Sequence, residues 1–147
     1  MTNNVAQQEN AASIGSALHR AENALRGATG GLLRELGLTV TQHAVLAAVH
    51  RAPGGLSGAQ LARLCQVTPQ TMATVLATLE TRELLGREPS GVHRRVLIAR
   101  LTRTGRDMLR RADLAVGSAE DRIVDAFEAQ EREELWCYLE RIVAALS

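Results

Sequence analysis

The chain has 147 residues and a formal net charge of +1, with 46% hydrophobic and 22% charged residues. This length suits one domain of ordinary size, and no stretch approaches the ~20 apolar residues that a membrane span needs, so we expect no membrane partner. The polar first ten residues lack the basic start and apolar run of a signal peptide, and two cysteines exclude a disulfide framework. These features predict a cytoplasmic protein with reduced thiols.

The small net charge hides an uneven distribution along the chain. Residues 1–81 balance to +1, residues 82–111 hold nine arginines and three acids for +6, and residues 112–147 balance to −6. A local block of +6 is typical of a surface that faces phosphate. An arginine-rich solvated surface paired with the acidic tail explains the pattern equally well, so charge alone leaves both interpretations open.

The first predicted elements are a disordered start over residues 1–10, which are polar, and one long helix. From residue 11 to residue 36, apolar side chains recur at intervals of three and four, which predicts a single apolar helical face. Gly27, Gly30 and Gly31 each weaken this helix by ~1 kcal/mol relative to alanine. Tertiary contacts must therefore support it, and a second subunit is a candidate.

The middle of the chain predicts a pair of short helices joined by a tight turn, preceded by a helix over about residues 42–51. Ser57 and Gln60 have the spacing of a capping box at the start of the first member of the pair. Thr68 as N-cap and Pro69 at the first helical position open the second. This arrangement is typical of a helix-turn-helix.

Beyond the helix pair the apolar pattern predicts a hairpin and two more helices. Residues 84–87 and 95–101 are expected to be strands on either side of a turn at residues 89–91, with arginines beside the tip. Thr102 is expected to cap a helix that reaches about residue 127. Apolar residues spaced by four, three and four then predict a last helix that ends near residue 146.

Seventeen residues carry a recognisable order: Leu38, Thr39, Gln42, Leu61, Ala62, Val67, Thr68, Pro69, Gln70, Thr71, Met72, Leu79, Glu80, Arg95, Leu101, Thr102 and Gly105. Their order and spacing resemble the winged-helix core of the MarR family of bacterial transcriptional regulators. The resemblance implies a mainly α fold with a small β-hairpin wing. It places a winged helix-turn-helix DNA-binding domain at residues 38–102 and helical dimerisation regions at residues 11–37 and 103–147.

The sequence departs from the family pattern at three places. His93 stands where the wing of the family has an aspartate, so a bracing pair with the arginine that follows is missing. Glu83 replaces the glycine that usually ends the second helix of the pair, which puts a left-handed helix cap in doubt. That helix, from Pro69 to Glu80, also contains no arginine or lysine.

The candidate base-reading residues are Gln70, Thr71 and Thr74, with Thr68 at the N-cap of the same helix. The major groove admits one helix, and side chains near its N-terminus read the base edges. Glutamine pairs with adenine, whereas threonine donates, accepts or offers its methyl group to thymine. The alternative is a polar, solvent-facing helix surface.

Arg94 and Arg95 at the wing are the candidate contacts outside that helix. A guanidinium on a hairpin can enter the narrow minor groove or clamp a phosphate, and the resemblance implies this role for Arg95. The alternative is that either arginine pairs with Glu83 or Glu88, an exposed pairing that contributes ~0–1 kcal/mol.

The resemblance implies a repressor that acts as a homodimer on a pseudopalindromic double-stranded DNA operator, with a small aromatic or anionic effector. No catalytic motif appears, so we expect no enzyme and no cofactor. The helix after the wing has no histidine, so we expect no metal. Cys65 is expected to pack in the core and Cys137 to be exposed. Two alternatives stay open: the flanking helices fold back as a monomeric bundle, or the chain is a helical protein-interaction module without specific DNA binding.

Overall fold

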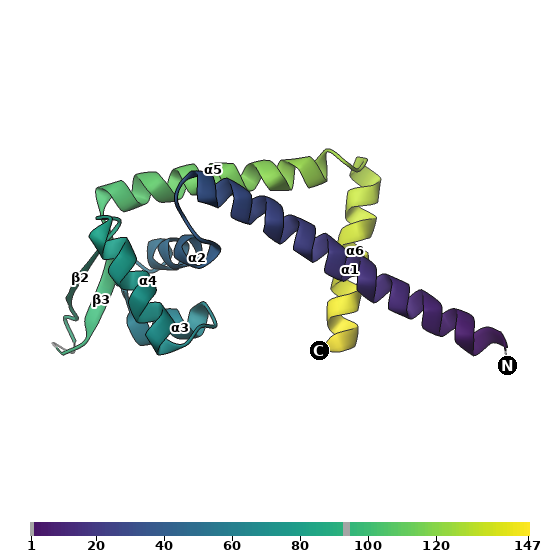
Figure 1. The fold of residues 1–147 in the computed structure, drawn as a ribbon, viewed down its shortest axis with the longest axis horizontal. Helices are drawn as coiled ribbons and strands as arrows, with labels where there is room; N and C mark the ends of the chain where they lie inside the picture. Colours follow the sequence, from purple (N-terminus) through teal and green to yellow (C-terminus); the bar gives the residue numbers. More distant parts are fainter. Residues whose placement is uncertain (1, 93–94) are drawn as a thin grey trace.

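The structure, a computed structural model, describes the backbone of residues 2–92 and 95–147 and, within these ranges, the side chains from Ser13 onward. It is mainly helical with a small antiparallel sheet, so the predicted fold class is confirmed (Figure 1). None of the described helices is both long and apolar enough to cross a membrane. The elements are α1 (Thr2–Glu35), α2 (Val40–His50), β1 (Leu56–Ser57), α3 (Gly58–Leu64), α4 (Pro69–Thr81), β2 (Leu85–Pro89), β3 (Leu97–Leu101), α5 (Arg103–Val124) and α6 (Ala129–Leu146).

Helices α2, α3 and α4 and the sheet form one packed unit around an aliphatic core. The sheet has the order β1-β3-β2 with antiparallel pairing throughout. The hairpin β2-β3 was predicted, whereas the two-residue strand β1 was not, since it is too short to show an alternating pattern. The largest fully buried side chains are Leu33, Leu38, Leu46, Leu61, Met72, Leu76, Leu79, Leu84 and Val45.

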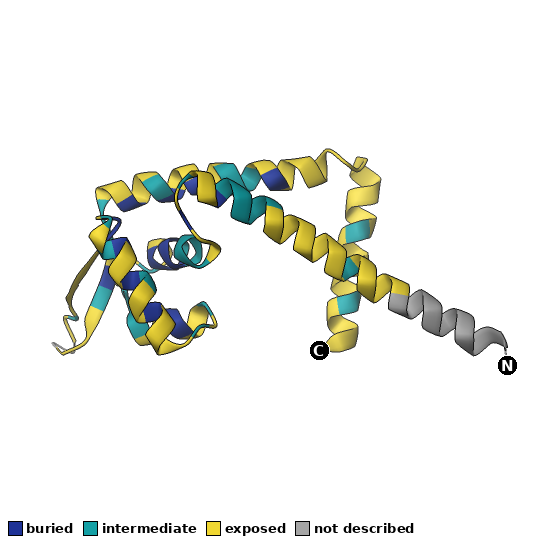
Figure 2. Ribbon diagram, viewed as in Figure 1, coloured by how far each residue is buried: buried dark blue, intermediate teal, exposed yellow. Residues whose placement is uncertain are grey.

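The long helix α1 contributes to this core only at its C-terminal end. Leu33 is fully buried there, and α1 packs against α5 and α2. Figure 2 shows the exposed middle of α1 leading away from the packed unit. The helix begins at Thr2, whereas we expected disorder over residues 1–10. The reason is local, because this stretch contains alanine, glutamine and glutamate, which propagate an established helix.

Side-chain caps set the starts of the short helices. The predicted capping box of α3 is present: the Ser57 amide donates to Gln60 Oε1 at 2.9 Å, and the Gln60 amide donates to Ser57 Oγ at 3.3 Å. Thr39 and Gln42 form the same box at α2 with distances of 3.0 and 3.1 Å, which the sequence analysis overlooked. Thr102 caps α5 as predicted and accepts from the Gly105 amide at 2.9 Å.

Three helices end with a residue in the left-handed region, and only one of these residues is glycine. Gly37 after α1, Gln66 after α3 and Glu83 after α4 have φ values of 70°, 54° and 56°. After α4, the Glu83 amide donates to Glu80 O at 2.8 Å and the Leu84 amide donates to Leu79 O at 2.9 Å, which is the Schellman arrangement. The cap that glutamate put in doubt is therefore formed without glycine.

Helix α6 stands apart from the packed unit at the far end of α5 (Figure 1). It has no buried residue. Several of its exposed side chains are large and apolar, namely Trp136, Tyr138, Leu139, Val143 and Leu146. An apolar helix surface of this kind is unpartnered in a single copy of the chain.

Candidate nucleic-acid interface

Helix α4 is anchored along one side and open along the other. Met72, Leu76 and Leu79 are at most 1% exposed and attach the helix to the core. The opposite side, called here the outward face, is exposed and contains no charged residue: Gln70, Ala73, Thr74, Ala77, Thr78 and Thr81. A helix that packs on the core along one side and is exposed to solvent along the other can enter a major groove.

The N-terminus of α4 brings together the four predicted residues of this helix. Thr68 is the N-cap and accepts a hydrogen bond from the Thr71 amide at 3.1 Å, and its hydroxyl donates to Thr71 Oγ1 at 2.9 Å. Thr68 therefore uses its hydroxyl within the chain, while Thr71 keeps its own proton for an outside acceptor. The Gln70 side-chain amide has no partner among the described residues, and Thr74 lies one turn further along the outward face.

The wing supplies one of the two predicted arginines. Arg95 lies just before β3, is exposed, and makes no ion pair within the described part of the chain. Glu88, one of the two partners considered for it, is paired with Arg100 instead. Arg94 and His93 lie outside the described residues.

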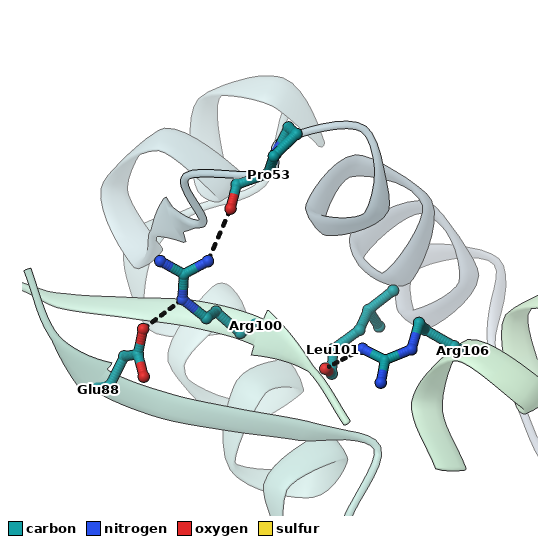
Figure 3. Close-up of polar contacts among 5 residues, drawn as sticks. All are labelled: Pro53, Glu88, Arg100, Leu101 and Arg106. Atoms are coloured by element: carbon teal, nitrogen blue, oxygen red, sulfur yellow. Dashed lines mark hydrogen bonds and ion pairs between the residues drawn. The ribbon is translucent and has the colours of Figure 1, made fainter. Parts of the chain in front are cut away.

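A brace at the base of the wing was missed by the sequence analysis (Figure 3). The Arg100 Nε donates to the Glu88 carboxylate, and Arg100 Nη1 donates to the carbonyl oxygen of Pro53 at 2.6 Å. Glu88 lies opposite Ile98 and Arg100 lies opposite Gly86, so the two charged residues are diagonal neighbours on one side of the hairpin. This contact joins both wing strands to the loop after α2.

Most arginines of the positive segment have internal partners. Arg82 and Arg106 donate to the backbone oxygens of Gly37 and Leu101 at 2.5 and 3.0 Å. Three more pair with acids: Arg87 with Glu80, Arg100 with Glu88 and Arg110 with Asp107. Among the described arginines of residues 82–111, this leaves Arg95, Arg103 and Arg111 without an internal partner. None of these acids belongs to residues 112–147, so the described contacts do not include the expected pairing with the acidic tail. The phosphate-facing surface stays a prediction.

A hollow of about 590 Å³ lies between the end of α2 and the surface of α5. Its charged lining is mixed, with three aspartates against two arginines. The lining residues are His50, Arg106, Asp107, Leu109, Arg110, Asp113, Leu114, Gly117 and Asp121. Beside it, His43 Nε2 of α2 and Asp113 Oδ1 of α5 lie 2.7 Å apart, which ties the packed unit to α5.

The two cysteines differ in their surroundings. Cys65 is half-buried against the core, and this burial raises the pKa of its thiol. Cys137 on α6 is exposed. No group of three histidine, cysteine, aspartate or glutamate side chains suited to a metal ion occurs within the described ranges.

Comparisons with known proteins match this arrangement. A model of the MarR family matches residues 36–96. The HTH-type transcriptional repressor Rv2887 of Mycobacterium tuberculosis is 37% identical over 131 residues, which cover 89% of this chain and 94% of the relative. Two crystal structures of the same relative are also similar. Its complex with DNA has a TM-score of 0.73 at 35% identity and covers 87% of this chain and 95% of the other. Its complex with salicylic acid has a TM-score of 0.67 at 37% identity and covers 87% and 94%.

Proposed function

Because the chain belongs to the MarR family of transcriptional regulators, we propose that it is a repressor that binds a pseudopalindromic DNA duplex as a homodimer. Members of this family regulate transcription and are not enzymes, so the chain has no catalytic function. Residues 38–102 form the DNA-binding domain in this proposal, and residues 11–37 and 103–147 form the dimerisation region.

The observation that carries the proposal is the placement of α4. Three buried side chains hold it, its outward face is exposed, and the same packed unit includes the wing, where Arg95 has no ion pair among the described residues. We assign Thr68, Gln70, Thr71 and Thr74 to the major groove, with Arg94 and Arg95 at the minor groove or backbone phosphate. The complex of Rv2887 with DNA supports DNA as the ligand, while the assignment of these residues to the grooves is our proposal.

The homodimer follows from the unpartnered helix surfaces at the far end of the molecule. An 18-residue helix with no buried residue has little to stabilise it in water, since helices in proteins depend on packing of their apolar side. Trp136, Leu139 and Val143 of α6 are 65%, 40% and 57% exposed, and Ile14 of α1 is 52% exposed. A second copy presents the same apolar surfaces and can cover them by two-fold symmetry.

A small aromatic acid is the proposed effector. The complex of Rv2887 with salicylic acid supports this chemistry. The hollow between α2 and α5 has a volume within the range of small-molecule sites. Its two arginines, Arg106 and Arg110, contact Leu101 O and Asp107 in this structure, so a bound carboxylate would compete with these partners. Binding there would act on the joint between the packed unit and α5, which is the route by which we expect the effector to release DNA.

The DNA-binding proposal is tested by fluorescence anisotropy with genomic promoter fragments under excess competitor DNA. We expect a specific complex whose affinity falls with salt, and Arg95→Ala should flatten the log–log salt dependence by about one unit per subunit because one phosphate contact is lost. Arg122→Ala, an exposed arginine near the end of α5, is the matched control and should leave the slope unchanged. An unchanged slope for Arg95→Ala would remove that residue from the interface. Absence of any specific complex would favour the protein-interaction module.

The homodimer is tested by sedimentation at micromolar concentration. The unmodified chain should sediment at about 32 kDa, twice its 15.8 kDa mass. Leu139→Glu should shift the population toward the monomer, because it places a charge in the apolar surface of α6. Glu140→Gln on the neighbouring position is the control. A clean 16 kDa species for the unmodified chain would contradict the dimer.

A further inference from the structure

Three of the four threonines of α4 donate their hydroxyl protons inside their own helix. Thr74 Oγ1 donates to the carbonyl oxygen of Gln70 at 3.3 Å, Thr78 Oγ1 donates to Thr74 O at 3.0 Å, and Thr81 Oγ1 donates to Ala77 O at 2.9 Å. Each hydroxyl has a single proton. These threonines therefore have no donor left for a base edge in this conformation.

Each of these side chains also presents a methyl group, while its hydroxyl oxygen can only accept a hydrogen bond. Ala73 and Ala77 add two more methyl groups between the threonines on the outward face. The face thus has a continuous row of small apolar groups, interrupted only by the free amide of Gln70 at its N-terminal end. Small side chains also let the helix backbone approach the groove floor closely.

The major-groove edge of an A·T base pair presents groups that match this face. Thymine is the base whose major-groove edge carries a methyl group, and contact with it is apolar, whereas adenine presents the donor and acceptor that a glutamine amide pairs with. Guanine is most often read by arginine or lysine, and α4 has neither residue. Arg94 and Arg95 belong to the wing and are not part of α4.

We propose that α4 recognises thymine methyl groups through the γ-methyl groups of Thr74 and Thr78, next to an adenine read by Gln70. This inference rests on the proposed DNA-binding function and defines its ligand: duplexes whose half-sites contain A·T pairs at the centre of the contact with α4. Specificity at these positions comes from burial of methyl groups and not from hydrogen bonds of the threonines.

The experiment begins with selection of bound duplexes from a randomised pool. The enriched duplex is then synthesised with each thymine replaced in turn by 2′-deoxyuridine, which removes the C5 methyl group and leaves base pairing intact. We expect enriched half-sites rich in A·T pairs. At one or two thymines in each half-site, the replacement should weaken binding about fourfold, because an apolar group of one carbon is no longer buried.

Two variants at the same position separate the methyl group from the hydroxyl group. Thr74→Ser keeps the hydroxyl and removes the methyl, so it should bind about fourfold more weakly and lose its preference for thymine over uracil at one position. Thr74→Val keeps the shape and the methyl and removes the hydroxyl, so it should retain that preference. Thr104→Ser makes the same chemical change at an exposed position of α5, outside the outward face, and should leave the thymine preference intact.

The outcomes distinguish the inference from the function on which it rests. If a sequence is enriched but uracil duplexes bind as tightly as thymine duplexes, the methyl-reading inference is overturned and the DNA-binding function stands. Loss of the thymine preference in Thr74→Val with retention in Thr74→Ser would also overturn it, because the hydroxyl would then be the reader. If no sequence is enriched over competitor, the proposed function fails and the inference fails with it.

Discussion

Arg82 Nη1 donates a hydrogen bond to the carbonyl oxygen of Gly37 at 2.5 Å, across 45 positions of the chain. A second, longer contact joins Arg82 Nη2 to Leu36 O at 3.5 Å. Arg82 is the C-cap of α4, and Gly37 is the left-handed residue that follows α1. The helix that we assign to base reading is thereby tied to the end of the helix that we assign to the dimer.

Arg82→Ala should lower the free energy of unfolding by about 1–2 kcal/mol, since a charged donor to two backbone oxygens is lost at a partly exposed site. It should also weaken DNA binding without changing the salt slope, because Arg82 orients α4 and contacts no phosphate. Urea unfolding and anisotropy titration measure the two effects. Arg82→Lys should recover part of the stability through one remaining hydrogen bond. An unfolding midpoint equal to that of the unmodified chain would contradict this account.

Glu83→Gly should stabilise the protein by about 1 kcal/mol, because a side chain at a φ of 56° carries a steric cost that glycine avoids. The backbone bonds that end α4 do not involve the Glu83 side chain and remain in place. Thermal unfolding should show a melting temperature about 3 °C higher. Glu83→Ala keeps a β-carbon at the same φ and should show no such gain; an equal gain for both variants would rule out backbone strain as the cause.

Gly105→Ala should prevent normal folding of the winged unit. A β-carbon at this position would lie 1.9 Å from the carbonyl oxygen of Leu84, so α5 and the segment before β2 would have to separate. We expect a loss of more than about 3 kcal/mol, or aggregation on expression. Gly117→Ala in the same helix meets nothing within 4 Å and should be neutral or stabilising by up to ~1 kcal/mol. Circular dichroism melts of the two variants provide the comparison.

Alkylation of Cys65 by iodoacetamide should require a higher pH in the folded protein than in the unfolded chain. Burial raises the pKa of this thiol in the folded state, so the reactive thiolate forms only at higher pH. Peptide mass spectrometry across pH 7–10 measures the rate at each cysteine separately, with exposed Cys137 as the internal reference. Equal pH profiles for Cys65 in the folded protein and in urea would contradict the effect of burial.

Helix starts were the most predictable part of this fold. Thr68 followed by Pro69, and Ser57 followed by Gln60, predicted the beginnings of α4 and α3 because capping involves groups only three residues apart. The ends of the same helices were harder to predict. Gln66 and Glu83 adopt left-handed backbone without the glycine that usually signals it, so their conformation depends on the packing of Val67 and Leu84 behind them.

The sequence by itself determined the order of helices, the hairpin and the exposed polar side of α4, because each depends on residues that are close along the chain. It also determined the family pattern, which consists only of the order and spacing of residues from Leu38 to Gly105. Only the tertiary structure decided which arginines remain available to a partner. Arg82 and Arg100 find backbone acceptors 45 and 47 positions away, and no local pattern contains that pairing. The tertiary structure also shows that α6 has no buried residue, because burial of an apolar helix surface depends on which other elements pack against it.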